Sequence, residues 1–440
     1  MNNLIIISLD CVRREAIGCY HRIFPSYFHN TIPALNLRGM RRLKRVYEPV
    51  IDPIIKWLFK PKTSYIDCIA SNGILFTQAV SQAPYTPASH ASIFTGLNPF
   101  NHGIRHFIGF KISPEVLTLA EVLKSFGFQT GGFIGSNALG EFYGFDRGFD
   151  VYDCNFNSKQ SICEVGNLKI FRRDHREITE RVLQWLNEIK DKFFLFIHYF
   201  DVHESSVPIT YQPFYQILKM REIDGSIGKI VQFLKDNGLY DNTIIIVLSD
   251  HGNDFGIHEP GHREFLFDTT ILVPLIIKAD KSLSGLQITR QVRLIDIMPT
   301  AVELLGLSID NQKNYMPMDG VSLLPLCNDN CQEELPAYSE TCIEYSSKQW
   351  NILKNSFMSL RVSGWKLVVD KINHKKYLYN ISKDPFERNN LCTTNKDMAD
   401  FLTHKLDNLQ TQPTQPSGIM TENEISMVKE SLKGLGYLDD

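Results

Sequence analysis

The chain has 440 residues, of which 43% are hydrophobic and 22% charged, which is typical of a globular protein with one large and one smaller domain. Its formal net charge of −3 at pH 7 argues against a nucleic-acid partner. The nine cysteines are scattered, odd in number and without a CxxC pair. They therefore argue against a disulfide framework and a structural zinc site, and they favour a reducing compartment.

The N-terminal sequence MNNLIIISLD predicts a buried strand. It has a short apolar run with no positively charged flank and no small-residue cleavage site, so it lacks the pattern of a secretory signal. No stretch of the sequence reaches the length of a membrane span. We therefore expect a cytoplasmic protein.

Residues 37–62 form an insertion rich in Lys and Arg with interleaved apolar residues. Its segment 38–61 suits an amphipathic element that makes peripheral contact with an anionic membrane or covers the mouth of an active site. An ordinary surface hairpin packed on the body fits the same pattern equally well.

The segment 83–105 predicts a helix that carries a hydroxyl at its start. Thr86 suits the N-cap, Pro87 the first helical position and Gly96 the stop. Because a helix N-terminus carries partial positive charge, this hydroxyl would face the place where a phosphate or sulfate binds. His90 lies one turn further on the same face. The alternative is that Thr86 is only a structural cap.

Three continuous apolar runs, at 4–10, 193–203 and 242–252, each end in Asp or His. Such runs are typical of parallel strands covered by helices on both faces. Ligands of parallel sheets bind beyond the carboxyl ends of the strands, so these ends should meet at one edge. The side chains expected there are Asp10, Asp201, His203, Asp250 and His251. Carboxylates and imidazoles together suit a divalent ion such as Zn, Mn, Ca or Mg.

Helical patterns at 115–127, 177–190 and 221–238 and a short strand within 130–139 separate these runs. The alternation predicts a doubly wound α/β sheet. Three further histidines have simpler interpretations: His198 as a packed core residue, His102 as part of a turn and His258 as part of a solvated loop.

The motifs resemble, in order, those of the sulfatase family of the alkaline phosphatase superfamily. The likeness rests on ISLDCVRREAIGCY at 7–20, TSYIDCIASNGILFTQA at 63–79, TPASH at 86–90, HYFDVHE at 198–204 and SDHGNDFGIHEPGH at 249–262. VPLII at 273–277, RLIDIMPTAVELLGL at 293–307, LYNISKDPFERNNL at 378–391 and LKGLGYL at 432–438 complete the order. The resemblance implies an alkaline-phosphatase-like, mostly parallel sheet with a small C-terminal antiparallel sheet and helix.

The resemblance also assigns residue roles. It implies that Asp10, Asp250 and His251 bind a metal together with the oxygen of Thr86, the nucleophile. It places two further catalytic groups, His203 and His262, at the oxygens of the ester or at a second cation. His90 and Asp201 are expected to contact the substrate.

Departures from the family pattern bear on the chemistry. Sulfatases of this family convert a Cys or Ser at the position of Thr86 into formylglycine, whereas superfamily members with a Thr nucleophile transfer phosphoryl groups. Cys11 stands where the family has an acidic residue, Ala88 replaces its Pro, and His90 replaces its Arg. An imidazole holds a negative charge only when protonated, unlike a guanidinium.

Three functions are compatible with this pattern. The first is a metal-dependent hydrolase or transferase that acts on a small-molecule, glycan or lipid phosphoric ester through Thr86. The second is a sulfuric ester hydrolase that works without formylglycine, and the third is a binding protein with a decayed site. We expect a catalytic domain over 1–325 and a C-terminal subdomain with a closing helix over 326–440.

Overall fold

The computed structural model describes residues 3–23, 60–105, 109–156, 162–165, 168–203, 207–209, 211–258, 265–309, 317–328, 334–344, 353–410 and 418–434. His262 and nearly all of the 37–62 insertion lie outside these residues. The predicted catalytic role of His262 and the predicted membrane contact or cap of segment 38–61 stay predictions.

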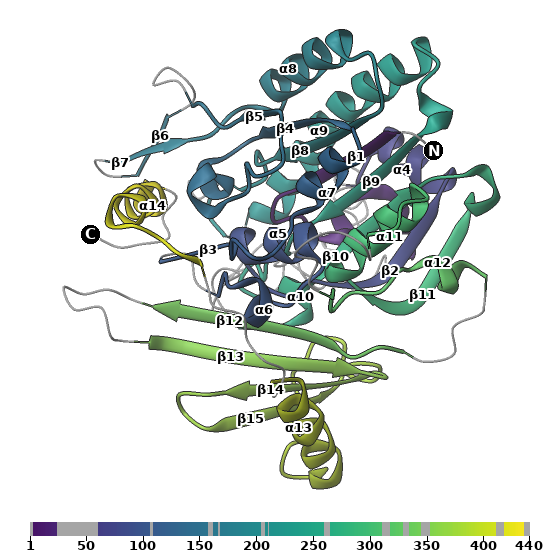
Figure 1. Cartoon of the computed structure of the whole chain (residues 1–440). Coiled ribbons are helices and arrows are strands. Elements are labelled where there is room, and N and C mark those ends of the chain that lie inside the picture. The colour runs from purple at the N-terminus through teal and green to yellow at the C-terminus, as the bar shows by residue number, and fades with distance from the viewer. Residues whose placement is uncertain are drawn as a thin grey trace, which may run out of the picture.

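The centre of the molecule is an eight-stranded sheet in the order β11-β2-β10-β9-β1-β8-β4-β5 (Figure 1). Its strands are β1 (Asn3–Leu9), β2 (Ile74–Val80), β4 (Gln129–Ile134), β5 (Val151–Asp153), β8 (Phe193–Tyr199), β9 (Thr243–Ser249), β10 (Leu272–Lys278) and β11 (Leu286–Arg293). β10 runs antiparallel to both of its neighbours, and the other neighbouring pairs are parallel. The predicted mostly parallel α/β sheet is confirmed.

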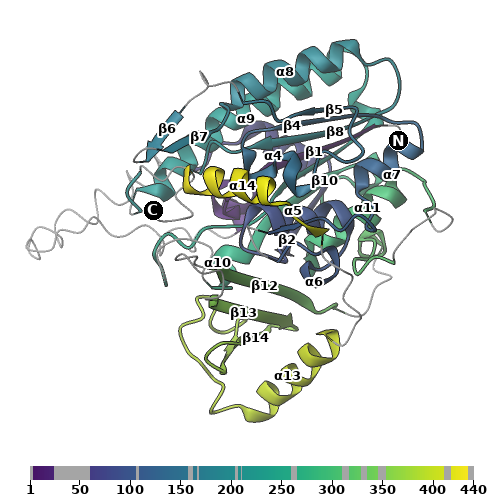
Figure 2. The same ribbon diagram turned by 60° about the vertical axis from the view of Figure 1, so that its left-hand side comes forward.

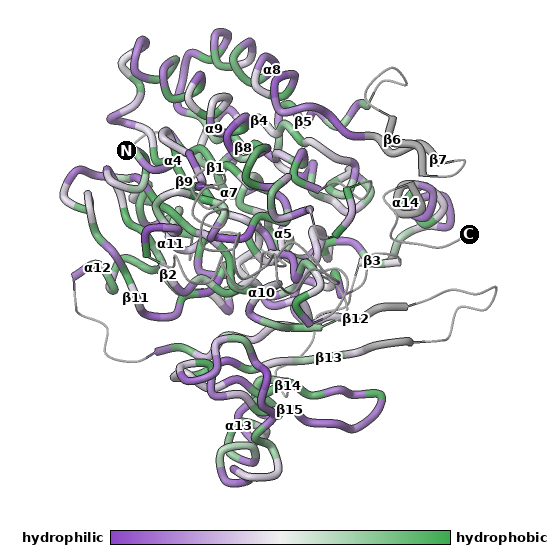
Figure 3. Tube along the Cα trace, turned by 180° about the vertical axis from the view of Figure 1, so that it is seen from behind, coloured by the Kyte–Doolittle hydropathy of each residue, from purple (hydrophilic) through white to green (hydrophobic). Residues whose placement is uncertain are grey.

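Helices cover both faces of this sheet (Figure 2). One layer contains α5 (Thr86–Thr95), α7 (Leu119–Ser125) and α11 (Ile297–Leu304), and the other contains α1 (Gly18–Ile23), α4 (Ser64–Ser71), α8 (His175–Glu188) and α9 (Gln212–Asp236). In β1, Leu4 and Ile6 pack into the core beneath the first layer, whereas Ile5 and Ile7 pack beneath the second. This alternation explains why the strand sequences are apolar throughout, as the green interior of Figure 3 shows.

Shorter elements complete the large domain: α6 (Pro99–His102), α10 (Asp268–Ile271), α12 (Leu324–Cys327), β3 (Phe110–Lys111), β6 (Ile162–Val165) and β7 (Leu168–Phe171). No helix within the described part of the chain combines the length and apolar character that crossing a bilayer requires.

A small antiparallel sheet in the order β12-β13-β14-β15 lies beside the large domain (Figure 1). Its strands are β12 (Ala337–Glu344), β13 (Leu353–Val362), β14 (Trp365–Asp370) and β15 (Lys375–Asn380), and α13 (Lys396–Gln410) covers one face. Leu402 and Leu406 of that helix share a core with Leu360 and Leu367 of the sheet.

The last segment departs from the predicted subdomain 326–440. β16 (Gly418–Ile419) pairs with β3, and α14 (Glu422–Gly434) lies beside β6 and β7 of the large domain (Figures 1 and 2). Val428 is fully buried in the large-domain core. α14 therefore packs with the large domain, because Val428 of its apolar face is buried there.

Candidate active site

The predicted meeting of strand ends occurs, because β9, β1 and β8 are neighbours with parallel direction. Asp10 follows β1, and its N–H donates to the carbonyl of Tyr199 at the end of β8 over 2.9 Å. Asp250 and His251 follow β9. One ligand atom from each of Asp10, Asp250 and His251 lies within 4.8 Å of the others.

Thr86 supplies the hydroxyl of this cluster. It is the first residue of α5 and not its N-cap as predicted, because Tyr85 holds the extended backbone (φ −154°, ψ 151°) that a cap position requires. Gly96 ends the helix in the left-handed conformation, as expected. Thr86 Oγ1 donates to Asp10 Oδ2 over 2.9 Å and lies 3.3 Å from His251 Nε2, fully enclosed.

His251 turns its Nε2 toward this hydroxyl. Its Nδ1 lies 2.9 Å from the carbonyl oxygen of Gly252, which can only accept, so Nδ1 donates a proton there. Nε2 lies 3.3 Å from Thr86 Oγ1 and 3.5 Å from Asp250 Oδ2. A carbonyl that fixes the tautomer in this way is typical of histidines that bind metals.

These side chains fit a divalent cation. Within the described part of the chain, Asp10 Oδ1 and Asp250 Oδ2 are buried without a hydrogen-bond donor, a costly state for carboxylate oxygens. Burial raises the pKa of Asp10, although the charges of His251 and His203 and the Thr86 hydrogen bond oppose the rise. A cation among these oxygens would compensate their desolvation and favour the ionised form of Asp10.

His90 lies beneath Thr86 and faces the protein interior. Its Nδ1 donates to the carbonyl of Thr86 over 2.9 Å, and its Nε2 accepts from Ser8 Oγ over 2.8 Å. Burial lowers the pKa of His90 to about 4, so the ring is neutral at physiological pH. Both ring nitrogens of His90 are therefore occupied in this structure, and neither is free for the predicted substrate contact. We assign His90 the positioning of α5.

His198 is buried, as expected of a core residue, but it also has a partner in the site. Its Nε2 lies 3.2 Å from Asp10 Oδ2 and donates to it, since a carboxylate only accepts. Burial lowers the pKa of His198 to about 4. Strand periodicity could not single out this residue, because the whole of β8 is buried.

His203 lies close enough to Asp10 for its charge to lower the pKa of that carboxyl. Its backbone N–H donates to the carbonyl of Phe200, and its half-buried ring stacks on the Phe200 ring at 4.9 Å. This position is compatible with its predicted role, which stays a prediction.

Asp201 faces a different part of the molecule. Its Oδ1 accepts from the backbone N–H of His175 at the start of α8 over 2.9 Å. Among the described residues, no hydrogen bond joins its carboxylate to Thr86 or Asp10. The predicted substrate contact through Asp201 is therefore not seen, because this side chain turns toward the α8 layer.

Cys11 contributes to the site through its backbone. Its φ of 59° is in the left-handed region, and its N–H donates to Asp250 Oδ1 over 3.1 Å. The thiol donates instead to the carbonyl of Gly252 over 3.4 Å, and burial raises its pKa well above the usual range. The residue that replaces the family's acidic side chain thus orients Asp250 without adding charge.

Three serines that the sequence did not single out hold the frame of the site. Ser8 donates to His90, Ser89 Oγ donates to the carbonyl of Asp250 over 2.7 Å, and Ser249 Oγ donates to the carbonyl of His251 over 2.7 Å. Ser8 and Ser249 lie in the apolar strands β1 and β9, where a polar residue is itself a signal, whereas Ser89 lies in α5.

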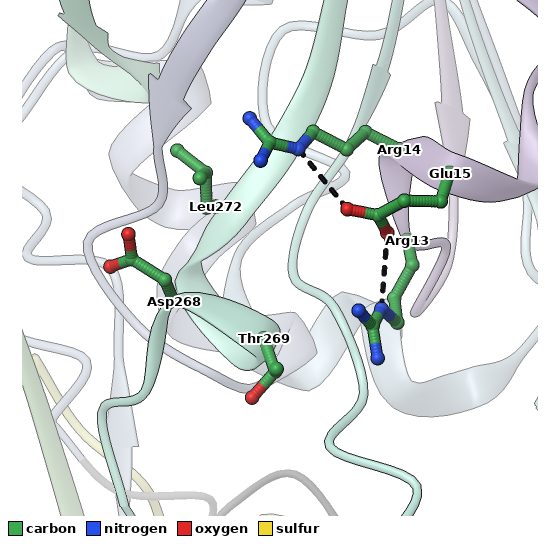
Figure 4. Close-up of a pocket in the computed structure, with 6 residues that line it drawn as sticks. All are labelled: Arg13, Arg14, Glu15, Asp268, Thr269 and Leu272. Atoms are coloured by element: carbon green, nitrogen blue, oxygen red, sulfur yellow. Dashed lines mark hydrogen bonds and ion pairs between the residues drawn. The ribbon is translucent and has the colours of Figure 1, made fainter. Parts of the chain in front are cut away.

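Beside the site lies a hollow lined by Arg13, Arg14, Glu15, Asp268, Thr269 and Leu272 (Figure 4). Glu15 pairs there with Arg13 at 3.1 Å and Arg14 at 3.3 Å. The hollow lies a few residues along the chain from Asp10. It places fixed positive charge near the strand end that carries Asp10.

His258 is not part of a solvated loop, contrary to expectation. It is half-buried, lies 2.7 Å from Asp254 Oδ1 and 2.6 Å from the Phe386 carbonyl, and stacks on Phe267 at 3.9 Å. The Asp254 carboxylate and the Phe386 carbonyl raise its pKa against the effect of burial. His258 thereby ties the loop after β9 to the C-terminal subdomain.

Comparison with known proteins decides the family. A model described as Sulfatase matches residues 2–307. The chain belongs to the sulfatase family. A second model, N-sulphoglucosamine sulphohydrolase, C-terminal, matches residues 256–412 of this sulfatase-family chain.

Arylsulfatase K of Danio rerio is 28% identical over 208 residues, which are 46% of this chain and 38% of that protein. Choline-sulfatase of Rhizobium meliloti is 27% identical over 204 residues, 46% of this chain and 37% of that protein. The chain thus spans less than half the length of these curated relatives. A weaker match, 20% identical, to arylsulfatase K of Mus musculus covers 82% of this chain and 77% of that protein.

Solved structures share the fold. Phosphonate monoester hydrolase of Agrobacterium radiobacter superposes with a TM-score of 0.70 and 18% identity over 94% of this chain and 96% of that chain. BT4656 in complex with D-glucosamine-2-N,6-O-disulfate gives a TM-score of 0.69 and 16% identity over 93% and 98%. At these identities the likeness shows the fold alone.

Proposed function

We propose that this protein is a metal-dependent ester hydrolase that uses Thr86 Oγ1 as its nucleophile, with phosphoric esters as the first substrate class. The observation that carries the proposal is the environment of that hydroxyl. It is buried at the N-terminus of α5, donates to Asp10 Oδ2 at 2.9 Å and lies 3.3 Å from Nε2 of His251. A structural cap needs neither contact.

Asp10, Asp250, His251 and Thr86 would hold a divalent cation, with Zn, Mn, Ca and Mg all compatible with the donors. Such an ion, when bound, lowers the pKa of a coordinated hydroxyl and neutralises charge on the ester oxygens. The protein fixes the donors beforehand: His198 orients Asp10, the Cys11 N–H orients Asp250, and the Gly252 carbonyl orients His251.

The proposed reaction has two steps. Thr86 Oγ1 gives up its proton toward Asp10 or His251 and forms a bond to phosphorus while the bond to the leaving oxygen breaks. The N-terminus of α5 stabilises the charge on the nonbridging oxygens. His203, and by the sequence prediction His262, would protonate the leaving oxygen. The resulting Thr86 ester then passes to water or to an acceptor alcohol.

A sulfuric ester is the second candidate, because the chain belongs to the sulfatase family and its curated relatives carry the names arylsulfatase and choline-sulfatase. Thr86 does not supply the Cys or Ser from which such enzymes form formylglycine, so a threonine would have to attack sulfur directly. The fold neighbours include a phosphonate monoester hydrolase, which is compatible with attack on phosphorus.

The test compares the wild type with Thr86→Ala and Thr86→Ser on aryl phosphate, aryl phosphodiester and aryl sulfate. We expect Thr86→Ala to lose about 10³-fold or more in rate and Thr86→Ser to retain part of it. Thr95→Ala, at the other end of α5, is the matched control. Mass spectrometry of quenched wild type should find the modified Thr86 peptide. Full activity of Thr86→Ala would refute the proposal.

A further inference from the structure

A second group of metal-binding side chains lies on the opposite face of the large sheet from Thr86, where the turn after β8 meets α8 and α9. It consists of Asp174, the N-cap of α8, His175, Asp201 and Glu222 of α9. One ligand atom from each of Asp174, His175 and Asp201 lies within 4.8 Å of the others. We propose that these residues form a second binding site for a divalent transition-metal ion.

Two buried polar atoms of this group have no hydrogen-bond partner among the residues that the structure describes. His175 is 3% exposed, and its Nε2 makes no hydrogen bond, although it lies 3.5 Å from Glu222 Oε2 and 4.0 Å from Asp174 Oδ1. Asp201 is 9% exposed, and its Oδ2 is likewise without a donor. Leaving such buried atoms unsatisfied is unfavourable, and a bound cation would satisfy both.

The remaining atoms of these two residues are held in a way that suits metal ligands. Asp201 Oδ1 accepts from the His175 N–H, which fixes the carboxylate, and the Tyr215 hydroxyl donates to the Asp201 carbonyl over 3.2 Å. His175 Nδ1 lies 2.8 Å from Ser226 Oγ. With the ring proton donated to Ser226, Nε2 presents its lone pair to the carboxylates.

The outer side of the site opens to solvent. The side chains of Asp174 and Glu222 are 38% and 48% exposed, which gives an ion a path of entry. Arg176 contacts Asp174 Oδ1 at 2.9 Å, and Lys219 contacts Glu222 Oε2 at 2.8 Å. Exposed pairs of this kind contribute little to stability, so an ion can displace them.

The donor set selects the class of ion. One imidazole with two or three carboxylates suits Zn²⁺ or Mn²⁺, whereas Ca²⁺ and Mg²⁺ prefer oxygen ligands alone. A bound ion would also fix the turn after β8, because its ligand Asp201 lies in that turn. His203 lies in the same turn, two residues further along. Occupancy of this site rests on its own contacts and does not depend on the proposed chemistry of Thr86.

The experiment measures Zn²⁺ and Mn²⁺ bound to the full-length protein after chelation and dialysis, by calorimetry and by elemental analysis. Variants His175→Gln and Asp201→Asn test this site, and Asp10→Asn tests the Thr86 site. We expect the first two to lose one equivalent of metal that Asp10→Asn retains. Glu180→Gln, elsewhere on α8, is the matched control.

Glu222→Gln keeps the proposal testable if a core variant fails to fold, since this side chain is half exposed. It should weaken binding by at least about tenfold without changing the melting temperature of the metal-free protein. The proposal is wrong if His175→Gln and Asp201→Asn, shown to be folded by circular dichroism, bind as much metal as the wild type. An unaffected Asp10→Asn variant would instead count against the Thr86 metal site.

Discussion

Lys366 is the buried cation of a charge network that joins the small sheet to the large domain. Its side chain is 0% exposed, and its Nζ lies 2.9 Å from Asp268 Oδ1 and 2.6 Å from Glu387 Oε1. Arg361 Nε lies 3.4 Å from Asp268 Oδ2. The backbone N–H of Asp268 donates to Glu387 Oε2 over 2.6 Å, so two carboxylates share this enclosed space.

Lys366→Met keeps most of the side-chain volume but removes the ammonium group. Two buried carboxylates then face each other, and Arg361 and Arg14 remain to compensate the charge of Asp268. Breaking a buried ion pair by removing one partner costs about 3–5 kcal/mol. Because a domain of this kind is stable by about 5–15 kcal/mol, we expect a large fall in the urea midpoint.

The two carboxylates also predict how this variant can be rescued. Burial raises the pKa of Glu387 to about 7, although Lys366 lowers it, so loss of Lys366 should raise that pKa further. A carboxyl with a raised folded pKa stabilises the protein at low pH and loses that contribution as pH rises through the folded value. Lys366→Met should therefore be least stable above pH 7 and partly recover at pH 6.

Urea unfolding followed by tryptophan fluorescence measures these effects. Lys366→Met/Glu387→Gln should be more stable than Lys366→Met alone, since an amide carries no charge to bury. Lys375→Met, at an exposed position of β15, should change the free energy of unfolding by less than about 0.5 kcal/mol. A loss below about 1 kcal/mol for Lys366→Met, or no recovery in the double variant, would contradict the ionic account of this network.

Three further predictions concern stability. Burial lowers the pKa of His102 from 6.5 to about 3. The contribution of its neutral ring to the free energy of unfolding is therefore complete above pH 6.5, and it falls by about 1.4 kcal/mol per pH unit as the pH drops toward 3. His102→Gln should remove that slope between pH 6.5 and 5, and an unchanged slope in urea titrations would refute the assignment. Gly148 has φ +87°, and an added Cβ would lie 2.1 Å from the backbone N of Glu121, so Gly148→Ala should destabilise by more than about 1 kcal/mol. Gly225→Ala in α9 meets no atom within 4 Å and should stabilise by about 0.5–1 kcal/mol; equal melting temperatures for the two variants would contradict this expectation.

Helix boundaries show which signals the sequence carries. The helix predicted over 115–127 begins at Leu119, where Thr118 and Glu121 form a capping box that the letters TLAE already contain. The helix predicted from residue 221 begins at Gln212, with Pro213 in its first turn. In both cases the apolar spacing locates the helix, whereas the capping box and the proline mark where it starts.

The continuous apolar runs predicted the strands well, because burial on both faces leaves one recognisable pattern. The same pattern hides which polar side chain faces which layer. His198 is the packed, hydrogen-bonded core residue that the sequence predicts, but its partner is Asp10 of the site. His90, predicted to contact substrate, instead contacts Ser8 and the Thr86 carbonyl. The role of each histidine depends on a partner more than 80 positions away in the sequence, which is Asp10 for His198 and Ser8 for His90. Local periodicity cannot predict such a contact.

The alternation of side chains along the strands explains how the polar residues divide between the two sites. Leu248 and His198 point to the α5 side of the sheet, and Val247 and Tyr199 to the α8 side. Continued past the strand ends, this period of two places Asp250 and Asp10 on the side of Thr86 and Asp201 on the side of α8. The hydrogen bonds of Thr86 to Asp10 and of His175 to Asp201 follow this division. Asp201 follows the carboxyl end of its strand, as Asp10 and Asp250 do, so this position alone does not separate the three residues. The alternation of side chains along each strand does separate them.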